Sequence, residues 1–253
     1  MKDRDILRVL QFTDTHLSAD SGKEYYGVNT DKSLRQVIRY ALDHFPQTDL
    51  ALVTGDLVHD ETVAGYERLK GHLENLNMPV YCLPGNHDLP ELMNKILSNS
   101  NVRMARSTLA ESWQIIQLNS TIPNEVGGHL HQHELEWLEH CLNDYPNHHA
   151  LICLHHPPFL TGSHWLDDGL LLDNPEELFA VVDRYRQIRC VLWGHIHQEY
   201  YIVRNGIDYY ATPSTMIQFK PNSYDFAVDD KSPGFRWLNL HADGRLETGV
   251  VYL

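Results

Sequence analysis

Residues 79–88 read PVYCLPGNHD, an apolar run that is followed by Gly85, Asn86, His87 and Asp88. The run has the composition of a strand buried on both faces, and Pro84-Gly85 is a turn signal that ends it. Amide, imidazole and carboxylate groups therefore follow directly after a buried strand. In open α/β sheets, ligands bind outside the carboxyl ends of the strands, so this stretch predicts part of a binding site.

Four other apolar runs end in the same kind of residue. They are ILRVLQF (6–12) before Thr13-Asp14-Thr15-His16, LALVT (50–54) before Gly55-Asp56, ALICL (150–154) before His155-His156-Pro157-Pro158, and CVLW (190–193) before Gly194-His195-Ile196-His197. Apolar residues at helical spacing occupy 34–42, 135–142 and 178–185, between the strands. This alternation predicts an α/β fold whose sheets are covered by helices.

The C-terminal part of the chain has a different pattern. Beyond about residue 200 the apolar residues alternate, and Asn205-Gly206 and Asp243-Gly244 are hairpin-turn dipeptides. We therefore expect antiparallel strands at this end. No repeat or Pro/Gly-rich linker divides the chain, so residues 1–253 are expected to form one domain.

The charge and composition exclude several classes of function. Lys and Arg number 20 against 34 Asp and Glu, which gives a net charge of −14. Nucleic acid and anionic membranes attract basic proteins, so neither is an expected partner. No run approaches the roughly 18 apolar residues of a membrane span, no signal-peptide pattern is present, and the four cysteines form no C-x-x-C motif. We expect a folded protein of the cytoplasm, a reducing compartment.

The residues at the five strand ends predict a metal site. Carboxylate, amide and imidazole donors without thiolate suit Mn, Fe, Zn or Co. The candidate ligands are Asp14, His16, Asp56, Asn86, one histidine of the 155/156 pair, His195 and His197. A single catalytic metal usually has about three protein ligands, so this set predicts two metal ions. Asp56 is the expected bridge because it follows its strand alone, whereas in D-x-H and H-x-H pairs both side chains point the same way if the backbone is extended.

In this order, D-x-H, G-D, G-N-H-D, H-x-P and G-H-x-H, the motifs over residues 14–197 resemble those of the calcineurin-like metallophosphoesterase superfamily. The resemblance implies a four-layer α-β-β-α sandwich, two mixed β-sheets flanked by helices. It implies one metal held by Asp14, His16, Asp56 and His197, and another by Asp56, Asn86, His156 and His195. His156 gives the H-x-P pattern with Pro158, but His155 fits it with Pro157. Fe and Mn are the expected metals, with Zn and Co as alternatives.

Two metals can activate a bridging hydroxide that attacks a phosphodiester in line. The resemblance places His16, Asn86, His87 and His197 closest to the phosphate. His87 is not a ligand in this family, and we expect it to assist the leaving group as a proton donor, with Asp88 orienting its ring.

Departures from other branches of the superfamily narrow the substrate. The stretch Gly55 to Asp60 has no Arg of the protein phosphatase kind, and His59 stands where purple acid phosphatases have a metal-bound Tyr. Segments 27–30, 211–215, 218–221 and 232–236 resemble bacterial class III 3′,5′-cyclic AMP phosphodiesterases. The expected reaction is hydrolysis of cyclic AMP to 5′-AMP.

Two other functions compete with this one. They are another phosphodiesterase or phosphomonoesterase of the superfamily, such as a glycerophosphodiesterase or nucleotidase, and a non-catalytic metal-binding regulator. Three aromatic residues, Tyr25, Tyr26 and Phe219, are candidates to stack on a nucleobase, with core packing as the alternative. His59 is a candidate to contact the ligands from behind.

Overall fold

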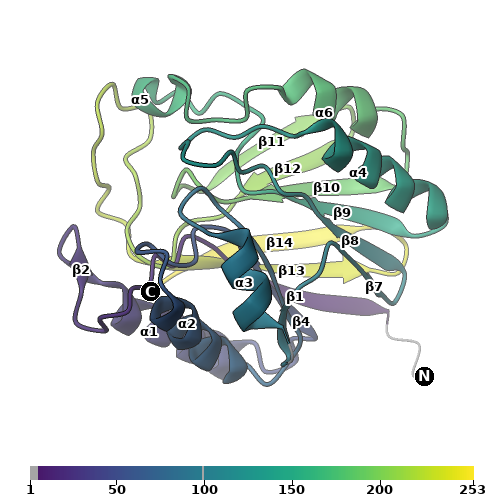
Figure 1. Ribbon diagram of the computed structural model, residues 1–253. Helices are drawn as coiled ribbons and strands as arrows, with labels where there is room; N and C mark the ends of the chain where they lie inside the picture. The colour runs from purple at the N-terminus through teal and green to yellow at the C-terminus, as the bar shows by residue number, and fades with distance from the viewer. Residues whose placement is uncertain (1–4, 99) are drawn as a thin grey trace.

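The first strand, β1 (Ile6–Phe12), is apolar on both of its faces. Leu7 and Val9 belong to one core cluster and Leu10 and Phe12 to another, because successive side chains of a strand leave opposite faces. Such a strand must be covered on both sides. The computed structural model, which describes residues 5–98 and 100–253, shows the two covers: a second sheet on one face and helices on the other (Figure 1).

Two six-stranded sheets form the centre of the fold. The first has the order β14-β13-β1-β4-β5-β6 and contains β4 (Leu50–Thr54), β5 (Val80–Leu83), β6 (Val102–Met104), β13 (Gly234–His241) and β14 (Leu246–Tyr252). The second has the order β11-β12-β10-β9-β8-β7 and contains β7 (Ser107–Ala110), β8 (Trp113–Gln117), β9 (His149–Cys153), β10 (Ile188–Trp193), β11 (Tyr200–Arg204) and β12 (Ile207–Ala211). Both sheets are mixed, because parallel central strands are joined by antiparallel ones at their edges.

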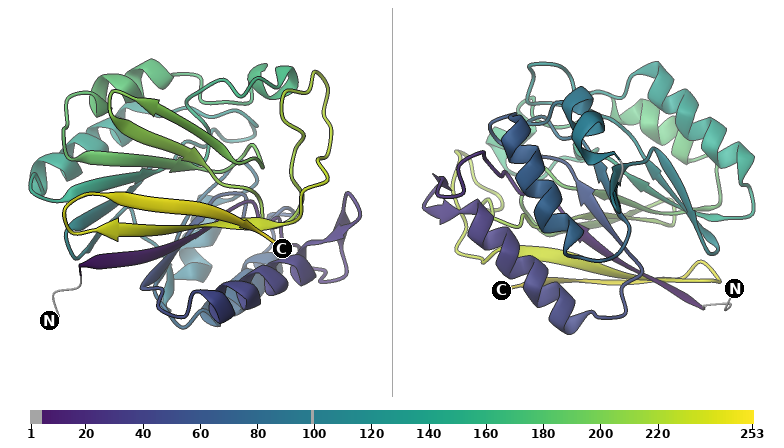
Figure 2. Two further views of the ribbon diagram at one scale, coloured as in Figure 1. Left: turned by 180° about the vertical axis from the view of Figure 1, so that it is seen from behind. Right: turned by 60° about the horizontal axis from the view of Figure 1, so that its bottom comes forward.

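Helices cover the outer face of each sheet (Figure 2). The first sheet packs against α1 (Thr30–His44), α2 (Val63–Glu74) and α3 (Pro90–Leu97), and the second against α4 (Gln132–Asp144), α5 (His164–Asp167) and α6 (Pro175–Val182). A third cluster, with Leu52, Trp113 and Leu192, fills the space between the sheets. The expected four-layer sandwich of two mixed sheets is confirmed.

The hairpins expected near the C-terminus are also present. Asn205 and Gly206, both with positive φ, join the antiparallel strands β11 and β12, and a turn at Gly244 joins β13 to β14. A further two-stranded hairpin, β2 (Glu24–Tyr25) and β3 (Val28–Asn29), was not expected from the sequence. The helix predicted over residues 178–185 ends earlier than expected, because α6 stops at Val182, before Tyr185.

Candidate metal centre

The carboxyl ends of five strands meet at one place, but the strands belong to two sheets. β1, β4 and β5 lie in the first sheet, and β9 and β10 lie in the second. Backbone hydrogen bonds join the loops that follow them: Asp14 N donates to Gly55 O at 3.0 Å, and Gly194 N donates to His155 O at 3.3 Å. The site therefore straddles the edge at which the two sheets face each other.

Three overlapping groups of buried side chains at this edge could each hold a metal ion. They are Asp14, His16 and His197; Asp14, Asp56 and His155; and His155, His156 and His195. Within each group the ligand atoms lie within 4.8 Å of one another. Asp56 connects two sides of the site, because its Oδ1 is 3.3 Å from His155 Nε2 and its Oδ2 is 3.6 Å from His16 Nε2. This geometry suits a carboxylate that faces two metal positions.

The backbone at the site is not extended, contrary to the expectation for the D-x-H and H-x-H pairs. Five of the candidate ligands have positive φ: Asp14 (53°), His16 (43°), Asp56 (52°), His195 (66°) and His197 (46°). Residues other than glycine rarely adopt this conformation, and such strain is found mainly at functional sites. In the pairs Asp14/His16 and His195/His197, both members have left-handed backbone instead of extended backbone.

Glycines of the motifs allow the loops to approach one another. A Cβ on Gly85 would lie 2.3 Å from Asp56 Oδ1 and 2.8 Å from His155 Nε2. A Cβ on Gly194 would lie 2.0 Å from Thr13 Oγ1 and 2.7 Å from Asp14 Oδ2. The absence of a side chain at these two positions is what lets the candidate ligands come together.

Two histidines are held in the tautomer that a metal ligand needs. His155 Nδ1 lies 2.8 Å from Thr54 O, and His197 Nδ1 lies 2.9 Å from Ile217 O. A carbonyl oxygen can only accept, so Nδ1 carries a proton in both rings and Nε2 is the atom left to bind a metal. Each Nε2 faces a carboxylate: His155 faces Asp56, and His197 lies 3.3 Å from Asp14 Oδ1. Metal-binding histidines are commonly oriented in this way.

His156, the ligand expected from the sequence, is arranged differently. Its Nε2 lies 3.1 Å from Val126 O and therefore donates to it, while its Nδ1 lies 2.8 Å from Ser120 Oγ and accepts from that hydroxyl. Both ring nitrogens thus have protein partners, one of which a metal would have to displace. The geometry argues against His156 and favours its neighbour His155.

The other donor atoms fit a metal centre. Asn86 Oδ1 and both ring nitrogens of His195 are buried without a hydrogen-bond partner among the described residues. Unpartnered buried polar atoms are costly, and a bound cation would satisfy them. Burial lowers the pKa of His16 to about 3 and that of His195 to about 4, so both rings are neutral, as metal ligands must be.

His87 lies beside the candidate ligands and is half-buried. Its ring centroid is 5.0 Å from that of His16, and its backbone N–H donates to Asp56 Oδ1 at 2.9 Å. His59 stacks on the His87 ring at 4.6 Å, and its Nδ1 lies 3.2 Å from His16 Nδ1. His59 therefore contacts a candidate ligand from behind.

Asp88 does not have the expected geometry for orienting the His87 ring. Its buried carboxylate accepts from the backbone N–H groups of Gly85 (2.9 Å), Leu57 (3.0 Å) and Val58 (3.2 Å). It also accepts from the Tyr66 hydroxyl at 2.9 Å. Asp88 thus ties the loop after β5 to the loop after β4, which is a structural role.

Replacing Asp88 by Ala should lower the free energy of unfolding by more than ~3 kcal/mol, because several buried donors lose their acceptor together. Tyr66→Phe removes one of these hydrogen bonds and also the one that the Tyr66 hydroxyl accepts from Leu89 N–H, so it should cost about 1–2 kcal/mol. Urea unfolding of the two variants and the wild type, all free of metal, measures the difference. Normal stability of Asp88→Ala with a reduced turnover would instead support a role on the His87 ring.

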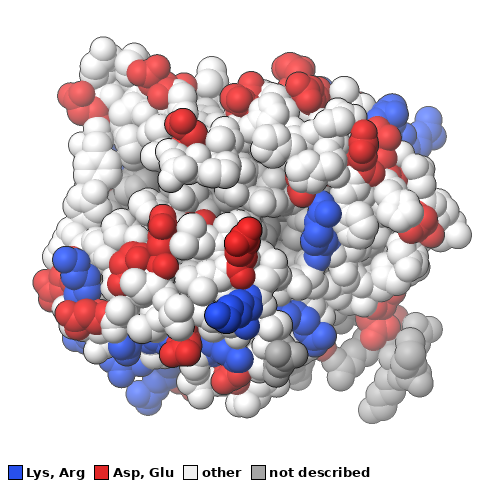
Figure 3. All heavy atoms as spheres, in the orientation of Figure 1, with Lys and Arg blue, Asp and Glu red and all other residues white. Residues whose placement is uncertain are grey.

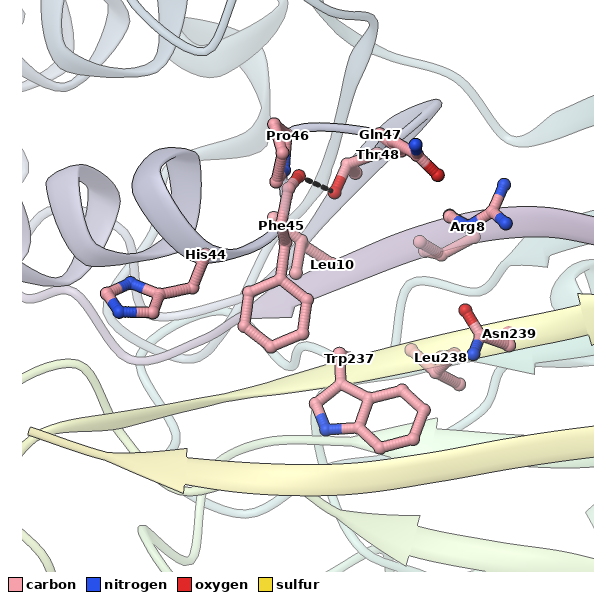
Figure 4. Close-up of a pocket in the computed structure, with 11 residues that line it drawn as sticks. Arg8, Leu10, His44, Phe45, Pro46, Gln47, Thr48, Trp237, Leu238 and Asn239 are labelled. Atoms are coloured by element: carbon pink, nitrogen blue, oxygen red, sulfur yellow. Dashed lines mark hydrogen bonds between the residues drawn. The ribbon is translucent and has the colours of Figure 1, made fainter.

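The protein also has a cavity away from the candidate ligands. It holds about 360 Å³ and lies between the C-terminal end of α1 and β13, where Phe45, Trp237, Arg8 and Asn239 line it (Figure 4). None of the candidate ligands lines it. On the face drawn in Figure 3, Asp and Glu are scattered around a hollow that crosses its middle, and Lys and Arg side chains also lie beside it.

Comparison with known proteins identifies the family. Residues 7–199 match the family model described as calcineurin-like phosphoesterase. The chain belongs to this family. Among the curated relatives of this phosphoesterase, a 3′,5′-cyclic-nucleotide phosphodiesterase of Nostoc is 41% identical over 99% of this chain and 94% of its own. The 3′,5′-cyclic adenosine monophosphate phosphodiesterase CpdA of Escherichia coli is 40% identical over 96% of this chain and 89% of its own.

Solved structures show the same fold at low sequence identity. A dimetal phosphatase from Danio rerio superposes with a TM-score of 0.67 at 14% identity, covering 98% of this phosphoesterase and 99% of that chain. A purple acid phosphatase from yellow lupin gives 0.66 at 15% identity, covering 98% of this chain and 54% of its own. Within the described residues of the phosphoesterase, no helix has the length and apolar character needed to span a membrane.

Proposed function

We propose that this phosphoesterase hydrolyses 3′,5′-cyclic AMP to 5′-AMP at a dinuclear metal centre. One observation carries the proposal: buried carboxylate, amide and imidazole donors converge at the ends of five strands, with Asp56 between two groups of them. The full-length similarity to relatives named as cyclic nucleotide phosphodiesterases supports this substrate.

The donors divide into two sets. One metal would be held by Asp14, His16, Asp56 and His197, and the other by Asp56, Asn86, His155 and His195. This assignment differs from the one expected from the sequence only in replacing His156 by His155. The bound metal ions would supply the positive charge that attracts the phosphate and would activate the attacking water.

The side chains around this centre would bind and orient the substrate. His16, Asn86, His87 and His197 would contact the phosphate. The attack on phosphorus breaks the P–O3′ bond, and the O3′ atom that leaves must gain a proton. His87 is the candidate donor, because its ring lies beside His16. Among the described residues, the candidate metal group that includes His87 consists of His16, His59 and His87 and contains no carboxylate.

His87→Ala should lower kcat for cyclic AMP by about 10²–10⁴-fold, the usual contribution of a general acid. The loss should be much smaller with bis(4-nitrophenyl) phosphate, because a nitrophenolate leaves without needing a proton. Metal content measured by elemental analysis should equal that of the wild type. A fall in bound metal would mark His87 as a ligand instead.

The proposed activity is tested by adding Mn or Fe to metal-free protein and measuring hydrolysis of cyclic AMP and bis(4-nitrophenyl) phosphate. Turnover of cyclic AMP with release of 5′-AMP is expected. Hydrolysis of the artificial diester alone would favour another phosphodiesterase of the superfamily. Failure to hydrolyse either compound with two metals bound would favour a non-catalytic regulator.

The metals and the compartment are part of the proposal. The donor set suits Fe or Mn, with Zn or Co as alternatives, and elemental analysis of protein purified without added metal identifies the ions. The four cysteines, which are all buried and free, accord with a reducing compartment, the cytoplasm.

A further inference from the structure

Two loops meet beside the metal centre through exposed aromatic side chains. One is the turn between β2 and β3, and the other is the long loop between β12 and β13; both views of the ribbon place them on the same side of the fold (Figures 1 and 2). The rings of Tyr26 and Phe226 are in contact, with centroids 5.2 Å apart. Tyr26 is 65% exposed and Phe226 is 42% exposed. Large aromatic rings exposed in this way often mark a binding surface.

Ring contacts connect these two loops to the candidate ligands on two sides. Phe219 stacks on the ring of His197 with centroids 4.0 Å apart, and Phe226 lies 5.5 Å from Phe219. On the other side, Tyr25 lies 4.0 Å from His59, which contacts His16. The aromatic residues therefore form a rim at the metal centre, and we use "aromatic rim" for Tyr25, Tyr26, Phe219 and Phe226.

The four residues of the aromatic rim are not equally available to a ligand. The Tyr25 hydroxyl is hydrogen-bonded to Ser18 Oγ at 2.7 Å, and one face of Phe219 is covered by His197. Tyr25 and Phe219 are therefore held by contacts within the protein. Tyr26 and Phe226 retain exposed ring surface, so they are the members that can contact a substrate.

The backbone at Tyr26 indicates that its side chain has a role beyond folding. Tyr26 has a φ of 52° and Gly27 a φ of 77°, as in the two-residue hairpin turn that favours Asn-Gly. A bulky aromatic residue at positive φ is a genuine outlier, and such strain is typical of ligand-binding positions. Asparagine at position 26 would suit the turn better than tyrosine.

We propose that Tyr26 and Phe226 form the surface on which the nucleobase of the cyclic nucleotide stacks while its phosphate binds at the metal centre. The proposal rests on the proposed function and adds the base-binding site to it. Stacking on aromatic rings needs no charge and is worth a substantial part of the affinity for a base.

The variant Tyr26→Asn separates binding from folding. It should keep or raise the melting temperature, because the backbone strain is relieved, and it should raise KM for cyclic AMP by about tenfold with kcat nearly unchanged. Phe226→Ala should raise KM similarly. Tyr26→Phe keeps the aromatic ring, so its KM should equal that of the wild type. Tyr224→Ala is the matched control: Tyr224 is in the same loop and 71% exposed, but it packs on His164, outside the aromatic rim.

A base-free substrate shows whether the loss concerns the nucleobase. Methyl ribofuranoside 3,5-cyclic phosphate has the same cyclic phosphate but lacks the base. The rise in KM in Tyr26→Asn and Phe226→Ala should occur with cyclic AMP and not with this compound. By calorimetry, 5′-AMP should bind these variants about tenfold more weakly than it binds the wild type, whereas binding of ribose 5-phosphate should not differ. Equal losses for both substrates, or no loss for cyclic AMP, would overturn the stacking proposal. A wild-type protein that fails to cleave cyclic AMP would instead overturn the proposed function.

Discussion

Replacement of Asp56 by Asn is expected to lower the rate of phosphodiester hydrolysis by at least ~10³-fold, more than the loss of a single transition-state donor usually costs. The carboxylate is buried and presents one oxygen to His155 and the other to His16. An amide has one oxygen and no charge, so it cannot serve two metal positions. One substitution would therefore remove the ligand that the two ions share, and at least one ion would lose a ligand.

Elemental analysis and kinetics on the same preparations check this expectation. Asp56→Asn should bind at most one metal ion per chain at concentrations that give two in the wild type. Asp43→Asn is a matched control, because it makes the same chemical change on the exposed surface of α1. Two bound ions together with a rate within tenfold of the wild type would show that Asp56 does not bridge.

The fold was predictable because its strands are buried on both faces. Runs such as residues 50–54 are apolar up to their last residue, Thr54, and are buried throughout, which only a layer on each side can achieve. α2 and α3 were not predicted. α2 contains Gly65 and Gly71 and buries few apolar side chains, and α3 has only eight residues, so neither has a long apolar stripe.

The position of the candidate site was also predictable, because its residues follow the strands directly. The backbone conformation was not. The D-x-H and H-x-H pairs were expected to be extended, but Asp14, His16, His195 and His197 have positive φ. Nothing local in these segments requires that conformation. It is imposed by contacts between loops, such as Asp14 N to Gly55 O within the first sheet and His195 N to Asp14 Oδ1 between the two sheets.

The roles of single residues depended on partners distant in sequence. Asp88 follows His87 by one position, yet its partners include backbone groups of the loop after β4, about 30 positions earlier. Phe226 lies outside every motif, and its place beside the site is revealed by its ring contacts with Tyr26 and Phe219. Such contacts have no signature in a single sequence.

The adjacent histidines His155 and His156 show the same limit, and they carry the last prediction. Each is followed two positions later by a proline, so the H-x-P pattern does not distinguish them. The choice depends on the tautomer of each ring, which Thr54 O sets for His155 and Val126 O sets for His156. His155→Ala should therefore release one metal ion and lower the rate by at least ~10³-fold, as loss of a ligand implies.

His156→Gln should have a smaller effect of a different kind. Glutamine, like the neutral ring, offers a donor for Val126 O and an acceptor for the Ser120 hydroxyl, so the loops should stay in place. Both metal ions should remain bound, and the rate should fall by about 10–100-fold at most, as for residues that only support ligands. If His156→Gln loses an ion and His155→Ala keeps two, then metal binding turns the His156 ring away from Val126 and Ser120, and the ligand assignment reverses.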